Sequence, residues 1–212
     1  MTAGPQTAPA ILPAGENLLV ELRARLAQAP AEAVGGHDDY DFSVAAQQAV
    51  RAAVMLPLTG GPQPSLLLTR RTQHLARHSG QVSFPGGRSE AHDLSPLETA
   101  LRETQEETGI APAFVTLAGY LDRYVTGTGF DIQPVVGVLA EGYALAPDAR
   151  EVAEIFQVPL AFLMDPANRR RESRVWQGRS RSFYAYNWQG HEIWGATAAI
   201  IVDLAQRFGL AR

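Results

Sequence analysis

Three glutamates stand close together near the middle of the chain, and their spacing gives them a common chemistry. Glu103, Glu106 and Glu107 follow one another at intervals of three and one residues. A helix turns by about 100° per residue, so this spacing puts all three carboxylates within roughly one 100° arc. Carboxylates crowded in this way raise each other's pKa values unless a cation lies among them. Their hard oxygen atoms suit Mg²⁺ or Mn²⁺, which keep bound waters and share their remaining coordination with substrate phosphates.

An acidic run of this kind also has a plainer interpretation. An isolated Glu-x-x-Glu-Glu run is usually the solvated face of a helix. Here a Gly86-Gly87 pair comes shortly before the run. Because glycine has no side chain, its backbone lets a phosphate or a metal ion approach closely. This context favours a metal and phosphate site.

A well-marked helix must carry the three glutamates. Ser95-Pro96-Leu97-Glu98 forms a capping box with proline at the first helical position, and Gly109 follows the last turn. The arc beside the glutamates should pack inward, and it carries Leu97, Ala100, Leu101, Thr104 and Thr108.

The composition excludes several classes of chemistry. The 212 residues include 18 basic side chains, all of them arginine, and no cysteine. Without lysine there is no amine for Schiff-base or P-loop chemistry, and without cysteine there are no disulfides, thiolate metal sites or cysteine nucleophiles. The formal net charge of −4 supplies no basic excess for a nucleic acid partner.

The sequence also leads to an expectation about location. No run reaches the ~18 apolar residues that a membrane helix needs, so we expect no membrane partner. Residues 1–15 have the composition of a flexible leader and lack the basic region of a secretory signal. We therefore expect a cytoplasmic protein.

Hydrophobic periodicity predicts helices on both sides of a set of strands. Besides the capped helix, we expect helices at 17–28, 158–164 and 196–208, and strands at 49–58, 65–69, 114–125, 130–138 and within 174–194. The first two strands are close enough to form a hairpin. This order is typical of a layered α/β (α+β) domain. We interpret residues 16–212 as one domain, in which a helical extension precedes a core of about 46–212.

The string from Gly86 to Ile110 resembles the Nudix box. Gly86-Gly87 and Asp93 are followed by Arg102-Glu103-Thr104-Gln105-Glu106-Glu107-Thr108-Gly109-Ile110. The string departs from the general pattern in three ways: Thr104 replaces a bulky aliphatic residue, Asp93 replaces Glu, and eight residues instead of seven precede Arg102. None of these departures affects the three glutamates.

The segment upstream of the box is similar to the coenzyme A pyrophosphatase branch of that family. It reads Leu67-Leu68-Thr69-Arg70-Arg71-Thr72 and then Gly80-Gln81-Val82-Ser83-Phe84-Pro85-Gly86-Gly87. Thr72 stands where Ser or Ala is usual, and Ala76 replaces an expected Arg, with Arg77 beside it. Residues 151–160 also resemble this branch, and the longer box with Asp93 is itself typical of it.

The resemblance implies a fold and a metal site. It predicts a Nudix-type α/β/α sandwich around a mixed β-sheet, and one or more Mg²⁺ or Mn²⁺ ions held by Glu103, Glu106 and Glu107, with the Gly86 carbonyl as an addition. The general base is either Glu103 or a downstream acid, Glu151 or Glu154. Asp93 and Arg102 are expected to form a structural salt bridge that braces the loop against the helix.

The resemblance also implies a substrate. We expect hydrolysis of the pyrophosphate of coenzyme A or acyl-coenzyme A, with Arg70, Arg71, Arg77 and the bare backbone of Gly87 contacting its phosphates, including the 3′-phosphate. The alternative for the arginines is solvated loop charge. Arg71 is favoured because it fits the branch signature.

Other functions remain open at this point. A hydrolase of ADP-ribose, NADH or another nucleoside diphosphate derivative would need the same box, and a non-catalytic ligand sensor could use the same fold. The intact glutamates count against the sensor. Trp176, Trp188 and Trp194 are interpreted as packing residues or, alternatively, as part of a homodimer surface.

Overall fold

The computed structural model describes residues 16–30, 34–35, 49–73, 80–176 and 179–210. The expected leader at 1–15 and the side chain of Arg77 lie outside these residues. The described helices are α1 (Glu16–Arg25), α3 (Pro96–Thr108), α4 (Leu160–Met164) and α5 (Ala196–Arg207), with short 3-10 turns at Pro112–Phe114 and Pro166–Asn168. None of the described helices is long and apolar enough to cross a membrane.

A mixed sheet of nine strands forms the centre of the described chain. Its main path runs β1-β7-β8-β2-β3-β4, with β5 also paired to β2, β6 to β8, and β9 to β3. The strands β2 and β8 pair in parallel, whereas β3 pairs antiparallel with β2, β4 and β9. The strand bounds are β1 Val34–Gly35, β2 Val50–Thr59, β3 Ser65–Arg71, β4 Val82–Ser83, β5 Gly86–Arg88, β6 Val115–Tyr120, β7 Arg123–Val125, β8 Phe130–Leu139 and β9 Val152–Pro159.

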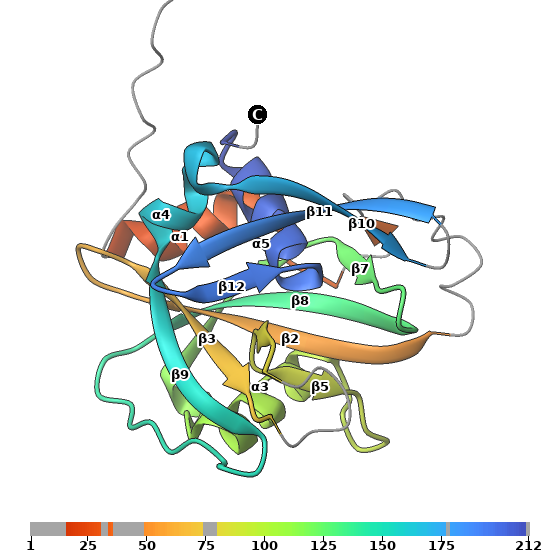
Figure 1. Cartoon of the computed structure of the whole chain (residues 1–212). Helices are drawn as coiled ribbons and strands as arrows, with labels where there is room; N and C mark the ends of the chain where they lie inside the picture. Colours follow the sequence, from red (N-terminus) through yellow and green to blue (C-terminus); the bar gives the residue numbers. More distant parts are fainter. Residues whose placement is uncertain (1–15, 31–33, 36–48, 74–79, 177–178, 211–212) are drawn as a thin grey trace, which may run out of the picture.

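A smaller antiparallel sheet covers part of the structure near α5. It consists of β10 (Arg170–Trp176), β11 (Arg179–Trp188) and β12 (His191–Trp194). Both β11 and β12 pack on α5, and β12 also contacts β4. The small sheet therefore lies on the α5 side of the central sheet, opposite α3 (Figure 1).

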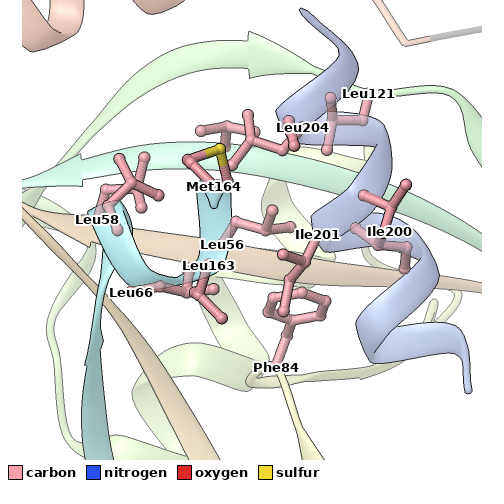
Figure 2. Packing of buried hydrophobic residues seen from close by; sticks show 14 of the residues in the cluster. Leu56, Leu58, Leu66, Phe84, Leu121, Leu163, Met164, Ile200, Ile201 and Leu204 are labelled. Carbon is pink, nitrogen blue, oxygen red and sulfur yellow. The ribbon is translucent and has the colours of Figure 1, made fainter. Parts of the chain in front are cut away.

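Alternation along the strands divides the core between the two faces of the central sheet. In β2, Leu56 and Leu58 belong to the large cluster that contains α1, α4 and α5, whereas Met55 belongs to the cluster that contains α3. Figure 2 shows Leu56 and Leu58 in the large cluster together with Ile201 of α5. Because side chains alternate between the faces of a strand, helices cover both faces, and the result is the expected α/β/α sandwich (Figure 1).

Most expected elements are present, with some differences. The strand expected at 114–125 is divided into β6 and β7. The strands expected within 174–194 are present as β10, β11 and β12, but the first of them begins at Arg170 rather than Arg174. The expected hairpin of β2 and β3 exists, but the two strands pair only at Leu58 and Leu66. β8 pairs with β2 along its whole length, and β5 pairs with β2 at Ala52, Ala53 and Val54. The pairing of β5 with β2 matters for the site because it fixes Gly86 and Gly87 beside Val54 and Ala53, in the part of the sheet that α3 contacts.

Candidate active site

The helix that carries the glutamates begins and ends where its sequence predicts. The Ser95 hydroxyl accepts a hydrogen bond from the Glu98 amide at 3.2 Å, and a Glu98 carboxylate oxygen accepts one from the Leu94 amide at 2.8 Å. At the other end, Gly109 has a left-handed φ of 80° and donates to the Gln105 carbonyl. These caps satisfy backbone groups that a helix leaves unpaired, and they fix which side chains of α3 face the sheet.

Glu107 is the most deeply placed carboxylate of the helix. Only 4% of the residue is exposed. Its Oε2 accepts a hydrogen bond from the Gly86 amide at 3.3 Å, and its Oε1 lies 3.4 Å from Nη1 of Arg71. Burial raises the pKa of Glu107 to about 8, against the opposing effects of Arg71 and the Gly86 amide. The charges of Glu103 and Glu151 also contribute to this raised pKa, so the three carboxylates form one electrostatic cluster.

Glu103 lies against the bare backbone of Gly87. A Cβ atom built on Gly87 would come within 2.6 Å of the Oε2 atom of Glu103, so only glycine fits beside this carboxylate in its present position. Burial raises the pKa of Glu103, and Arg102, which donates to its Oε1 at 2.9 Å, partly opposes this effect. The backbone of the Gly-Gly pair therefore packs directly against the Glu103 side chain of α3.

Glu106 lies at the outer side of the cluster. Its side chain is 59% exposed, and Oε2 accepts a hydrogen bond from Nη1 of Arg102 at 3.1 Å. The same guanidinium contacts Asp93 and donates to the Arg88 carbonyl at 3.0 Å. The structure thus brings Asp93 and Arg102 together as the sequence predicted, between the loop and the helix.

The pairing of β3 with β9 brings an acid from 80 residues away to the same place. Arg71 lies opposite Val152 in this pairing, and Glu151 immediately precedes β9. The Nη2 atom of Arg71 is 3.4 Å from Oε2 of Glu151, while Nη1 of the same guanidinium faces Glu107. Arg71 therefore links the helix acid to the loop acid.

Arg70 and Glu154 lie on the opposite face of the sheet. Neighbouring residues of a strand point to opposite sides, and Arg70 follows Leu68 on the side of the large cluster. Its Nε donates to Glu154 at 3.0 Å, and Nε2 of His191 is 3.6 Å from the other oxygen of Glu154. The His191 ring stacks on Phe156 at 3.9 Å, and Phe156 packs against the same large cluster. The structure therefore does not bring Arg70 or Glu154 to the glutamates of α3.

The donor set fits a hard divalent cation. In the described ranges, no group of three or more acidic or histidine side chains is placed so that it could hold a metal ion by itself. Mg²⁺ does not need one, because it usually takes one or two carboxylates, keeps several waters and shares substrate phosphates. Glu103 and Glu107 supply two carboxylates whose charged forms are disfavoured by burial and would be favoured by a cation. Beside them, Gly86 and Gly87 leave the approach free of side chains.

Two residues of this site, Gly86 and Thr72, make contacts that have no counterpart in the expectations from the sequence. Gly86 contacts Glu107 through its amide, whereas the sequence suggested a role for its carbonyl. Thr72 donates from its amide to the Glu151 carbonyl at 2.9 Å and from its hydroxyl to the Arg150 carbonyl at 3.1 Å. No local pattern could have shown the Thr72 contacts, because they depend on strand pairing across most of the domain.

A comparison with known protein families identifies the family to which the chain belongs. The NUDIX domain family matches residues 49–176, more than half of the chain, and the chain belongs to this family. It has the Nudix fold, and Nudix hydrolases act on small-molecule nucleotide derivatives, generally with divalent ions such as Mg²⁺ or Mn²⁺.

Several relatives share most of their length with this chain. A protein of Photorhabdus laumondii called uncharacterized Nudix hydrolase NudL is 42% identical over 156 residues, which cover 74% of this chain and 83% of that protein. The protein of the same name from Pectobacterium atrosepticum is 43% identical over 160 residues, with 73% and 81% covered.

Solved structures of the family resemble parts of the chain. The Nudix hydrolase RenU of M. smegmatis is 23% identical, with 53% of this chain and 71% of that chain covered and a TM-score of 0.45. The NUDIX domain of Shewanella oneidensis NrtR, complexed with ADP ribose, is 23% identical, with 58% and 80% covered and a TM-score of 0.43.

Proposed function

We propose that this protein hydrolyses the pyrophosphate bond of coenzyme A or acyl-coenzyme A, giving 3′,5′-ADP and (acyl-)4′-phosphopantetheine. The observation that carries the choice of substrate is the segment from Leu67 to Gly87, whose residues resemble the coenzyme A pyrophosphatase branch. This segment runs from β3 to β5, and two of its members, Arg71 and Gly86, contact the buried Glu107. Arg71 and Gly86 therefore connect the segment that suggests the substrate with the carboxylates that suggest the reaction.

Mg²⁺ or Mn²⁺ is the proposed cofactor. Glu103 and Glu107 would hold the ion, with Glu106 and the Gly86 carbonyl as further ligands. When bound, such an ion neutralises charge on the pyrophosphate and lowers the pKa of a water molecule. The glycine at position 87 lets the Glu103 carboxylate lie directly against the backbone of the Gly-Gly segment, because a side chain there would collide with it.

Glu151 is the proposed proton acceptor. Its side chain is 50% exposed, so solvent reaches it, and Arg71 orients it toward Glu107. In the proposed step, the oxygen of a water molecule attacks one phosphorus of the pyrophosphate, and the bond from that phosphorus to the bridging oxygen breaks. The bridging oxygen leaves with the other phosphate, and the proton of the water passes to the Glu151 carboxylate. Glu154 is not proposed, because it lies on the other face of the sheet with Arg70 and His191.

Product analysis by mass spectrometry tests this proposal. The protein is incubated with Mg²⁺ or Mn²⁺ and, in separate reactions, with coenzyme A, acetyl-coenzyme A, ADP-ribose and NADH, with Glu107→Gln as the control. We expect 4′-phosphopantetheine and 3′,5′-ADP from coenzyme A and no product from the variant. Cleavage of ADP-ribose or NADH alone would keep the pyrophosphate chemistry and contradict the substrate, with Ala76 as the first position to examine. Binding of a nucleotide without any cleavage would support a ligand sensor instead.

A further inference from the structure

The backbone on both sides of Glu151 is held in place by hydrogen bonds to other parts of the chain. Glu151 belongs to the loop between β8 and β9 and lies just before β9 begins at Val152. Apart from the ion pair of its carboxylate with Arg71, the position of this loop residue depends on the hydrogen bonds of its own backbone. Those bonds come from two sources, the end of α3 and Thr72.

The end of α3 holds the first part of this loop. The amide of Ala146 donates to the Thr108 carbonyl at 2.8 Å, and the amide of Asp148 donates to the Glu107 carbonyl at 3.2 Å. Both carbonyls belong to the last turn of the helix, where they have no helical partner. The Asp148 carbonyl in turn accepts a hydrogen bond from the Glu151 amide at 2.9 Å, so a short chain of hydrogen bonds connects the end of α3 to Glu151.

Thr72 holds the other side of the loop. It is 8% exposed and follows Arg71 at the end of β3. Its amide donates to the Glu151 carbonyl at 2.9 Å, and its hydroxyl donates to the Arg150 carbonyl at 3.1 Å. The Arg150 carbonyl is part of the peptide unit that also contains the Glu151 amide, so one residue fixes the backbone on both sides of the Glu151 side chain.

We infer that Thr72 is a positioning residue for Glu151, and that its hydroxyl sets where the Glu151 carboxylate stands relative to Arg71 and Glu107. Arg71 and Thr72 act on different parts of Glu151, because the guanidinium contacts the carboxylate and the threonine holds the backbone that carries it. This inference rests on the proposed function, since it acts through the role assigned to Glu151.

Two substitutions of Thr72 separate the hydroxyl from the rest of the side chain. Thr72→Val replaces the hydroxyl with a methyl group of similar shape, and Thr72→Ser keeps the hydroxyl. We expect Thr72→Val to lower kcat about tenfold with little change in KM, because small displacements of a reacting group cost one to two orders of magnitude. Thr72→Ser should stay within about twofold of the wild type. Thr59→Val is the matched control, because the Thr59 hydroxyl bonds Ser65 at the turn between β2 and β3; it should leave kcat unchanged.

A double-mutant cycle distinguishes positioning from general support of the fold. In a Glu151→Gln background, Thr72→Val should lower kcat by less than about twofold, because the group that it positions is already gone. A full tenfold loss in that background would overturn the inference, as would full activity of Thr72→Val in the wild-type background. Circular dichroism and the Tm confirm that each variant is folded, and Thr72→Ala replaces Thr72→Val if the latter is not. If the wild type cleaves no pyrophosphate substrate at all, the proposed function itself fails, which is a different result.

Discussion

The guanidinium of Arg102 holds the carboxylate of Asp93 through two parallel hydrogen bonds. Nε donates to Oδ1 at 3.1 Å and Nη2 donates to Oδ2 at 3.0 Å. Two-point contact of this kind gives direction as well as strength. Asp93 belongs to the loop after Gly87 and Arg102 to the middle of α3, so the pair fastens the Gly-Gly segment to the helix that carries the glutamates.

Asp93→Asn should therefore destabilise the fold. The side chains of Asp93 and Arg102 are only 3% and 17% exposed. We expect the free energy of unfolding to fall by about 2 kcal/mol at pH 7, as is typical for a hydrogen bond to a charged group. Urea unfolding measures this loss. Asp122→Asn removes a surface ion pair with Arg207 and should cost less than about 1 kcal/mol. Equal losses in the two variants would contradict a bracing role for Asp93.

The contribution of Asp93 should depend on pH in a defined direction. Hydrogen bonds from Arg102 hold the pKa of Asp93 well below its ordinary value of 3.8. An acid with a lowered pKa in the folded state binds fewer protons there than in the unfolded state. Its stabilising effect is therefore complete above the ordinary value, declines as the pH falls below that value, and is lost once the pH falls through the lowered pKa of the folded state. The difference in stability between wild type and Asp93→Asn should be constant from pH 7 to about pH 5 and should shrink below about pH 4. Because the pKa of Asp93 in the folded state lies well below 3.8, part of the difference should remain at about pH 2.5. A difference at pH 2.5 as large as that at pH 7 would contradict this assignment.

The sequence predicts best the parts of this site that lie close together along the chain. The capping box at Ser95 and the glycine at Gly109 define α3 within a residue, because both signals act through local backbone hydrogen bonds. The spacing of Glu103, Glu106 and Glu107 likewise follows from helix geometry. What this spacing does not reveal is that Arg102 draws Glu106 outward while Glu107 is buried, because that depends on what packs beside the helix.

The parts that the sequence does not predict depend on strand pairing over long distances. β9 has no clean alternation of polar and apolar residues, and its register against β3 shifts between Arg70 and Arg71. The sequence does not predict β9, so it also does not predict that Glu151 lies next to Arg71 and Glu154 next to Arg70. One step of register decides which acid joins the glutamates of α3, and local periodicity does not contain this information.

Glu107→Gln should abolish turnover and also the response of the protein to metal. Ligand at about 100 times its Kd stabilises a protein by about 2.7 kcal/mol, which for a chain of this size raises the Tm by about 5–10 °C. We expect such a rise for the wild type in Mg²⁺ or Mn²⁺ and little or none for the variant. Without metal the variant should be at least as stable as the wild type near pH 8, because it lacks a carboxylate whose charged form is disfavoured by burial. Differential scanning calorimetry measures both effects, and an equal Tm rise in both proteins would exclude Glu107 as a ligand.

Arg71→Ala tests whether this arginine serves the enzyme or the substrate. Because its guanidinium lies between Glu107 and Glu151, its loss should lower kcat by about tenfold or more through both carboxylates. The loss should be the same for coenzyme A and for dephospho-coenzyme A. Steady-state kinetics on the two substrates give the comparison. A rise in KM for coenzyme A alone would instead identify Arg71 as a clamp for the 3′-phosphate.

Gly87→Ala should impair catalysis while the fold persists. The added Cβ would come within 2.6 Å of the Glu103 Oε2 atom, so the carboxylate must move away from the Gly-Gly backbone. A shift of about 1 Å at a reacting group can cost about 100-fold in rate, and we expect a loss of that order in kcat. Gly60→Ala is the matched control, because a Cβ there meets its nearest atom at 3.8 Å, an ordinary contact. Wild-type kcat in Gly87→Ala, with both variants folded by circular dichroism, would show that the position of Glu103 beside Gly87 is not needed for the reaction.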